Sequence, residues 1–296
     1  MIPTEIVSMM ERRRIVAEVR TATAIQALGV VDALAAAGVN AIEVSLTIPG
    51  VNEILSHMAT RRDVFVGAGA VLDARQAMLA ISSGARFIAS PILAPDLVPV
   101  CNDANVACVL GALTPTEIIA AQHAGAQMVK VFPAEALGGP MYIRALLRQL
   151  THVSLQVSGG FTAQNMGEYL ALPVKTLALG TLLVPRPLVE RGNWQAITNR
   201  ARAFVEFVAN PHANAARFLA MMGIAPQPQA PAPMPIDPRI AAIAGMPTVN
   251  VPPEIAAAMA AMVSGSGQAD PGAVSGSFHP WDSRPVEMGD DEDWLR

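Results

Sequence analysis

Lysine and cysteine are both scarce in this chain of 296 residues. Lys130 and Lys175 are the only lysines among its 20 basic residues, and Cys101 and Cys108 are its only cysteines. Two cysteines at this spacing exclude a disulfide framework and fit neither a CxxC redox pair nor a zinc knuckle. We therefore interpret both as reduced packing residues. The lysine inside the apolar run "GAQMVKVFPAEALGG" (125–139) needs an explanation of its own.

Long apolar runs and strong net charge are also missing. No stretch of 18 or more apolar residues occurs, and in "MIPTEIVSMMERRR" the charges follow the apolar residues, the reverse of a secretory signal. We expect a cytoplasmic protein without membrane contact. The net charge is -4, and we interpret the run Arg12 to Arg14 as a solvated helix end. Nucleic acid is therefore not an expected partner.

Proline divides the chain near Asn210. Thirteen of the 24 prolines fall in the last 86 residues, and "APQPQAPAPMPIDP" (225–238) is typical of an extended linker. Residues 1–210 are predicted to form the folded domain. Residues 211–296 are predicted to be a largely disordered, Pro/Ala-rich extension, with short helices expected at 214–224 and 252–263.

The last ten residues, "EMGDDEDWLR", place an acidic cluster directly before Trp294 and Leu295. One interpretation is a solubilising end. The other is a peptide that inserts Trp294 and Leu295 into a protein partner's pocket while the carboxylates steer its approach. The sequence leaves both open.

Within 1–210, short β-branched runs alternate with longer alanine-rich segments of helical period. The spacing between strands averages roughly 23 residues, the size of a compact βα unit, and eight such units close into a (β/α)8 barrel. An open doubly wound sheet is the alternative, but "EVRTATA" follows the first strand where that fold wants a GxGxxG turn. The predicted strands are 15–19, 41–46, 64–68, 87–89, 107–110, 128–132, 154–157 and 176–179, and the predicted helices include 24–37, 74–83, 116–124, 141–149, 163–170 and 194–208.

Lys130 lies near the end of the sixth predicted strand, between Val129 and Val131. Residues at the carboxyl ends of barrel strands point into the active-site mouth. Burial disfavours the ammonium form, so we expect the pKa of Lys130 to fall towards neutrality and leave a nucleophilic amine that forms Schiff bases with carbonyl compounds. The alternative is a lysine whose stem packs in the barrel while its ammonium reaches water or a carboxylate.

Schiff-base chemistry also needs a proton carrier, and Glu43 is the candidate. It lies inside the apolar stretch "NAIEVSLTIP", where Ile42 and Val44 should face the helices and direct the carboxylate into the barrel. A buried carboxylate requires a partner, and the lysine across the lumen is the expected one. The alternative is a carboxylate satisfied by backbone amides.

Two glycine-bearing segments follow the last two strands, at the position where barrels of this kind often bind phosphate through backbone amides. "VSGGFTAQN" follows the seventh strand and "ALGTLLVP" follows the eighth. We expect the cradle to use Gly159, Gly160, Gly180 and Thr181.

Several segments together resemble one known family. "VKVFPAEALGGPMYIRALL", "NAIEVSLTIPG", "VGAGAVLDARQ", "FIASPIL", "LTPTE" and "VSGGFTAQNMGEYLAL" are similar to the 2-keto-3-deoxy-6-phosphogluconate (KDPG) and 4-hydroxy-2-oxoglutarate (KHG) aldolases, over about residues 5–208. The resemblance implies a class I Schiff-base aldolase on a (β/α)8 barrel, usually a homotrimer. It implies cleavage of a phosphorylated 2-keto acid to pyruvate and an aldehyde, with no metal and no redox cofactor.

The resemblance also assigns roles to residues. Lys130 matches the Schiff-base lysine and Glu43 the acid/base glutamate. The substrate-binding positions that it implies are Arg20, Thr47, Phe132, Ser158, Gly159, Gly160, Gly180 and Thr181.

Three positions depart from the family pattern. Ala70 replaces a threonine, Leu110 a proline and Ile92 a glycine, which removes one hydroxyl and predicts added bulk near the substrate. Two functions follow as hypotheses. The first is a working aldolase for KDPG or a related 2-keto acid. The second is a catalytically weakened aldolase-fold scaffold whose trimeric body displays a partner-binding tail.

Overall fold

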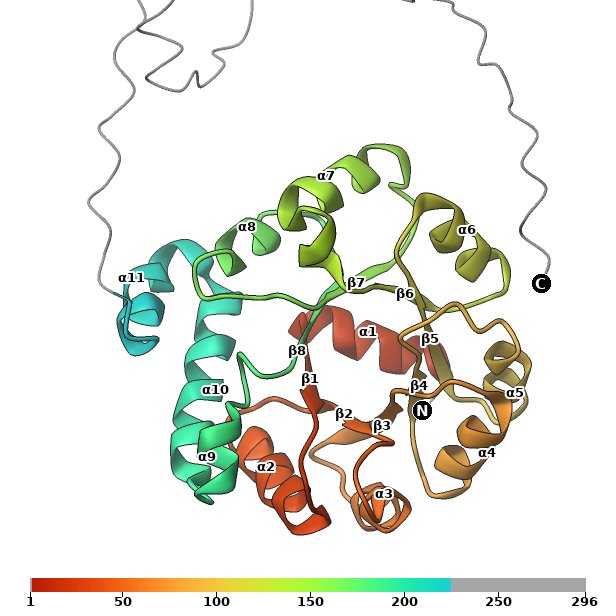
Figure 1. Cartoon of the computed structure of the whole chain (residues 1–296), viewed down its shortest axis with the longest axis horizontal. Helices are drawn as coiled ribbons and strands as arrows, with labels where there is room; N and C mark the ends of the chain where they lie inside the picture. Colours follow the sequence, from red (N-terminus) through yellow and green to blue (C-terminus); the bar gives the residue numbers. More distant parts are fainter. Residues whose placement is uncertain (1, 225–296) are drawn as a thin grey trace, which may run out of the picture. The chain divides into compact units, whose positions relative to one another are not determined.

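The eight predicted strands form one closed parallel barrel. The structure, a computed structural model, describes residues 2–224, so the linker at 225–238, the predicted helix at 252–263 and the Trp294-Leu295 end lie outside the described residues. Each strand pairs in parallel with the next one along the chain, and β8 pairs with β1. Figure 1 shows this ring surrounded by helices. The predicted barrel is confirmed, and the open doubly wound sheet is wrong.

Three observed strands have the predicted bounds, and the ends of the other five differ from the predicted ones by at most two residues. The strands are β1 (Ile15–Val19), β2 (Ala41–Ser45), β3 (Phe65–Gly69), β4 (Phe87–Ala89), β5 (Ala107–Ala112), β6 (Met128–Val131), β7 (Leu155–Ser158) and β8 (Thr176–Leu179). The helices are α1 (Pro3–Arg13), α2 (Ala24–Ala36), α3 (Val51–Ala59), α4 (Ala74–Ser82), α5 (Leu97–Asp103), α6 (Pro115–His123), the 3-10 turn η1 (Ala134–Leu137), α7 (Gly139–Gln149), α8 (Met166–Leu170), α9 (Arg186–Glu190), α10 (Trp194–Ala209) and α11 (Pro211–Met221).

Helix α1 closes one end of the barrel. Its buried residues Ile6, Val7 and Met10 pack against interior side chains that include Phe65 and Phe87, and Figure 1 shows the helix lying across the ring. This apolar plug occupies the end at which the strands begin. The opposite end, where the strands finish, is left for polar side chains.

The arginine run at the end of α1 is only partly solvated. Arg12 and Arg13 are exposed and lie in the last turn, as expected of a helix end. Arg14 instead turns inwards, and its guanidinium donates to the carbonyl oxygens of Leu170 and Leu172 at 3.3 and 3.4 Å. The prediction of a solvated end is therefore wrong for Arg14, which ties α1 to the segment before β8.

The predictions about the cysteines and about membrane-spanning segments can be compared with residues 2–224. Cys101 and Cys108 are free thiols, and both are buried, as predicted. Across residues 2–224, no helix combines the length and the apolar character needed to span a bilayer.

One helix packs on the barrel beyond Asn210, where the composition changes. Phe218 of α11 is 1% exposed. Its ring stacks on Phe207 with centroids 4.2 Å apart and meets Phe204 edge-on at 4.9 Å, both on α10. Helix α11 thus finds the docking surface that so short a helix needs.

A chain that ends at Asn210 is expected to be less stable than one that ends at Ile224. Removing a buried phenylalanine costs about 3–5 kcal/mol, which corresponds to a fall in Tm of roughly 6–20 °C for a domain of this size. Thermal unfolding followed by circular dichroism measures the difference. Equal midpoints for the two chains would contradict the packing of Phe218 described above.

Candidate active site

A cavity of about 520 Å³ opens at the end of the barrel where the strands finish. It contains nearly all of the predicted site residues. Thr47 is the exception, because it is exposed and does not line the cavity. Its hydroxyl forms a hydrogen bond with the hydroxyl of Ser45, which does line the cavity. The predicted residues that line it are Arg20, Glu43, Lys130, Phe132, Ser158, Gly159, Gly160, Gly180 and Thr181.

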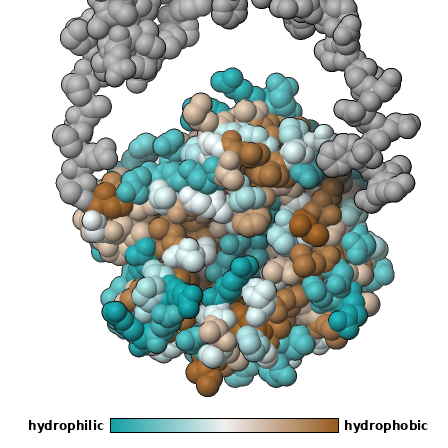
Figure 2. Space-filling view, in the orientation of Figure 1, coloured by the Kyte–Doolittle hydropathy of each residue, from teal (hydrophilic) through white to brown (hydrophobic). Residues whose placement is uncertain are grey.

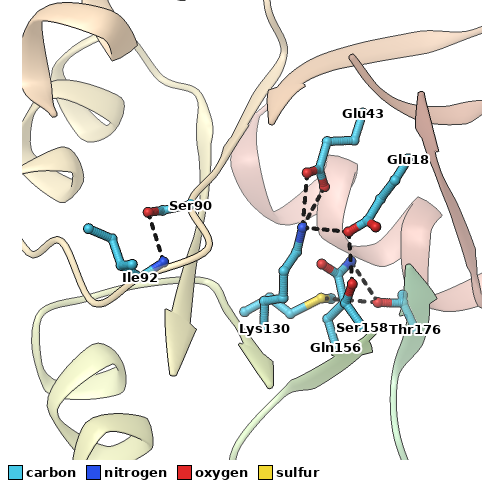
Figure 3. A network of polar contacts seen from close by, with 9 residues as sticks. Glu18, Glu43, Ser90, Ile92, Lys130, Gln156, Ser158 and Thr176 are labelled. Atoms are coloured by element: carbon cyan, nitrogen blue, oxygen red, sulfur yellow. Dashed lines mark hydrogen bonds and ion pairs between the residues drawn. The ribbon is translucent and has the colours of Figure 1, made fainter. Parts of the chain in front are cut away.

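Lys130 is held inside the barrel by the alternation of β6. Its neighbours Val129 and Val131 pack in the core between the strands and the outer helices, so the lysine side chain faces the lumen. Lys130 is 3% exposed. Its Nζ donates to Glu43 Oε2 at 2.8 Å and Oε1 at 2.9 Å, and to Glu18 Oε1 at 3.0 Å. Figure 3 shows both carboxylates directed at the amine.

Glu43 reaches the amine because β3 gives it room. In the barrel register, Glu43 lies opposite Gly67, and Gly69 follows two residues later on the same face. A Cβ atom at Gly69 would lie 2.2 Å from Glu43 Oε1, which is closer than atoms can approach. The predicted inward orientation of Glu43 and its pairing with the lysine are both observed.

Replacing Gly69 by alanine is expected to displace the Glu43 carboxylate. A misplacement of about 1 Å in a catalytic group can cost about 10²-fold in rate, so we expect a loss of this order in kcat. Gly167→Ala is the matched control, because a Cβ at that helix position meets no atom within 4 Å. The measurement is pyruvate release together with thermal unfolding. Equal kcat values for the two variants would contradict the close contact.

Of the charged residues that line the cavity in the described chain, Glu18 is the one that was not predicted from the sequence. It lies on β1, beside Glu43 in the register, and its Oε1 also accepts a hydrogen bond from Ser158 at 3.0 Å. The signal was available, because Glu18 is an acidic residue in the apolar strand "IVAEV", the same pattern that singled out Glu43. Two carboxylates therefore face one amine.

The expected fall in the pKa of Lys130 is wrong for the unliganded protein. Burial does act to lower it, but the attraction of Glu43 and Glu18 and their hydrogen bonds outweigh burial and raise the pKa of Lys130 above its usual value. Glu43, the partner expected from the sequence, raises the pKa of Lys130 more than Glu18 does, and Glu18 adds to the increase. The amine is buried, as expected, and the raised pKa favours its protonated form.

A neutral, nucleophilic amine at this position would require proton transfer within the cluster. Burial, the largest effect, raises the pKa of Glu43, while the charge of Lys130 acts to lower it. The neutral form of Glu43 is thus more accessible than that of an ordinary glutamate. Lys130 Nζ and Glu43 Oε2 are 2.8 Å apart, and a proton that passes between them along this hydrogen bond leaves a neutral amine beside a neutral acid.

The small number of lysines allows a direct test of this cluster. With 13C at the lysine ε carbon, NMR should show two signals, and exposed Lys175 serves as the internal reference. We expect Lys130 to titrate above about 10.4, the usual lysine pKa. The ion pairs of Lys130 therefore stabilise the folded state below about 10.4, the usual lysine pKa in the unfolded chain. This stabilisation is lost as the pH rises from there through the higher pKa of Lys130 in the folded protein.

Matched variants extend the titration. Glu43→Gln and Glu18→Gln should each shift the Lys130 midpoint to lower pH, because each removes a carboxylate that raises its pKa. Glu53→Gln, an exposed position on α3, should leave it unchanged. A Lys130 signal that titrates below about 10.4 in the unsubstituted protein would overturn the ion-pair account.

Two glycines and the hydrogen bonds of Asn165 determine the conformation of the turn after β7. Gly159 and Gly160 have φ of 88° and 89°, a region that favours glycine. A Cβ at Gly160 would lie 2.1 Å from Glu135 Cβ. Asn165 donates to the Gly160 carbonyl oxygen at 3.2 Å and to Glu135 Oε2 at 3.1 Å. The turn is therefore rigid where it borders the cavity.

Of the three positions that depart from the family pattern, only Ala70 lines the cavity. Leu110 is fully buried in the outer core between strands and helices, and Ile92 is 49% exposed. The expectation that Leu110 and Ile92 put bulk near the substrate is wrong, because neither side chain borders the pocket. The cavity is therefore not narrowed by them.

Metal ligands do not cluster in the described part of the chain. Within residues 2–224, no group of three or more His, Cys, Asp or Glu side chains is arranged to hold a metal ion. That no metal and no redox cofactor is required stays a prediction.

The fold and the site define a class of protein. A buried lysine paired with carboxylates at the open end of a parallel (β/α)8 barrel is the arrangement of a lysine-dependent, class I aldolase. A sequence model described as "KDPG and KHG aldolase" matches residues 6–200. The chain belongs to the KDPG and KHG aldolase family, whose members are aldehyde-lyases.

Characterised relatives agree with this assignment. The chain is 32% identical over 205 residues to the 2-dehydro-3-deoxy-phosphogluconate aldolase of Haemophilus influenzae, covering 69% of this chain and 97% of that one. It is 33% identical over 181 residues to the KHG/KDPG aldolase of Escherichia coli, covering 61% and 85%.

A solved structure is similar as well. A KDPG aldolase from Legionella pneumophila, with pyruvate captured at low pH as a covalent carbinolamine intermediate, superimposes with a TM-score of 0.63 at 27% identity. The match covers 67% of this chain and 97% of that one. The enzymatic hypothesis is therefore favoured over the catalytically weakened scaffold.

Proposed function

We propose that this protein is a class I aldolase that reversibly cleaves KDPG or a related 2-keto acid to pyruvate and an aldehyde. The observation that carries the proposal is the contact of the buried Lys130 amine with Glu43 at 2.8 Å inside the cavity. The cluster supplies a nucleophile and a proton acceptor in one water-poor place.

The proposed reaction starts when the neutral amine of Lys130 attacks the C2 keto carbon. Protonated Glu43 returns its proton to the resulting hydroxyl, which leaves as water and produces an iminium. Glu43, now a carboxylate, takes the proton of the C4 hydroxyl as the bond between C3 and C4 breaks, and C4 becomes the carbonyl carbon of the released aldehyde. The electron pair remains on an enamine, which takes the proton back from Glu43 at C3. Water then hydrolyses the iminium, which releases pyruvate and regenerates Lys130.

The remaining cavity residues are proposed to bind the substrate. Arg20 is exposed at the edge of the cavity and forms no ion pair with any of residues 2–224, which leaves it free for the substrate carboxylate. Phe132 offers an apolar wall. The turns at 158–160 and 180–181 offer backbone amides to the far end of the substrate, which carries a phosphate in KDPG.

The test is cleavage of KDPG and of 4-hydroxy-2-oxoglutarate by the full chain, with pyruvate release coupled to NADH oxidation by lactate dehydrogenase. We expect at least one of the two to be cleaved, and the rate to be unchanged by Lys175→Ala, which alters only the exposed lysine. No pyruvate from either compound, or from unphosphorylated 2-keto-3-deoxygluconate, at millimolar concentration would refute the proposal.

Assembly and location are further proposals. We propose a homotrimer, supported by the family resemblance and by apolar side chains left exposed on α4, Met78 at 54% and Leu79 at 48%. Figure 2 shows apolar residues at several places on the surface of the barrel. Light scattering should give three times the 31.0 kDa chain mass. We also propose a cytoplasmic location, in keeping with the two free thiols.

A protein partner for the C-terminal end is proposed from the sequence alone, because Trp294 and Leu295 lie outside the described residues. A pull-down should compare the full chain, a chain ending at Ile224 and the Trp294→Ala variant. Ending the chain at Ile224 keeps Phe218 in place, so lost binding would not reflect damage to the barrel. Identical partners for all three proteins would count against a tail partner.

A further inference from the structure

The cavity contains a second carboxylate that the proposed reaction does not use. Glu18 lies between the Lys130 amine and the turns that border the far end of the cavity. Its Oε1 accepts hydrogen bonds from Lys130 Nζ and Ser158 Oγ, both at 3.0 Å. Figure 3 shows Glu18 beside Glu43, with Ser158 on its other side.

The second oxygen of Glu18 faces one of the turns assigned to the substrate. Among residues 2–224, no side chain or backbone group donates a hydrogen bond to Oε2. A Cβ placed on Gly180 would lie 3.6 Å from this oxygen, so Oε2 lies beside the turn of Gly180 and Thr181. An acceptor without a donor is thus left open to whatever occupies this side of the cavity.

The charges around this oxygen are unfavourable for a second anion. The cationic side chains that line the cavity are Arg20 and Lys130, and the charge of Lys130 is already shared between Glu18 and Glu43. In the proposed reaction, Arg20 binds the substrate's own carboxylate. A phosphate on the amides of the two turns would therefore lie next to the Glu18 carboxylate without a cation between them, and like charges so placed repel.

We propose that Glu18 is a specificity-determining residue that favours a 2-keto acid with a hydroxyl, rather than a phosphate, at its far end. A hydroxyl can donate to the open Oε2, whereas a phosphate dianion can only accept and is repelled. The inference rests on the proposed aldolase function and narrows its substrate class to unphosphorylated, polyhydroxylated 2-keto acids.

The experiment compares kcat/KM for 2-keto-3-deoxygluconate with that for its 6-phosphate, using the full chain, Glu18→Gln and the control Glu53→Gln. We expect the unsubstituted protein to prefer the unphosphorylated compound by about tenfold or more, and Glu18→Gln to shift the ratio towards the phosphate by about tenfold or more. Glu53→Gln should leave the ratio unchanged, since Glu53 is exposed on α3. A preference of the unsubstituted protein for the phosphate, or an unchanged ratio in Glu18→Gln, would overturn the proposal.

If Glu18→Gln does not fold, a second measurement on the unsubstituted protein still tests the proposal. Inorganic phosphate, tested as an inhibitor of the unsubstituted protein, should not compete with substrate at low millimolar concentration, and competition there would overturn the proposal. Reductive trapping of pyruvate distinguishes a failure of the aldolase function from a failure of the proposed role of Glu18. No adduct on Lys130 would remove the aldolase function and this inference together, whereas an adduct with an unchanged ratio removes only the role of Glu18.

Discussion

Replacing Lys130 by methionine is expected to lower kcat/KM for 2-keto acid cleavage by roughly 10⁴-fold or more, because the covalent intermediate cannot form. Methionine keeps the length of the side chain and removes the amine. The variant leaves Glu43 buried without its cation, which costs about 3–5 kcal/mol for a group of this kind, so its unfolding midpoint should fall as well.

A double variant separates chemistry from stability. Lys130→Met combined with Glu43→Gln removes both members of the closest ion pair. It should unfold at a higher temperature than Lys130→Met alone and remain inactive. Cleavage by either protein at more than about a hundredth of the original rate would contradict a Schiff base at Lys130.

Replacing Glu43 by glutamine should lower kcat by roughly 10²–10⁴-fold, the usual contribution of a general acid/base. The amide has nearly the shape of the carboxyl group but cannot take the proton from the ammonium. The fold should persist, because Glu18 still pairs with Lys130 at 3.0 Å. Pyruvate release by the coupled assay measures the change.

The same assay on Glu53→Gln, an exposed carboxylate on α3, controls for a general effect of lost charge. If kcat for Glu43→Gln stays within tenfold of the unsubstituted value, Glu43 is not the proton carrier. Glu18, the other carboxylate in contact with the amine, would then have to take that role.

The barrel could be predicted because each of its units repeats the same local pattern. Short β-branched strands and alanine-rich helices recur at a nearly constant spacing. Each strand can therefore be predicted from the residues within it and directly beside it. Lys130 and Glu43 could be predicted for a related reason. A charge between outward-facing apolar residues must point into the lumen, whatever the rest of the chain does.

The protonation state of Lys130 was predicted wrongly, because it depends on the balance between burial and two carboxylates whose distances from the amine do not follow from local patterns. Glu18 lies 112 positions from Lys130, and only the closed ring brings its carboxylate to 3.0 Å from the amine. The inward turn of Arg14 has the same origin, since its acceptors lie near residue 170. Local patterns show which side of a strand a residue occupies, and the closed barrel decides what it meets there.

Reductive trapping with pyruvate tests the central claim most directly. The protein is incubated with pyruvate and sodium borohydride, digested and analysed by mass spectrometry, and its two lysines make the outcome unambiguous. We predict one reduced pyruvyl group on Lys130 and none on exposed Lys175. An unmodified Lys130, or equal labelling of both lysines, would contradict the assignment of Lys130 as the amine that attacks the keto acid.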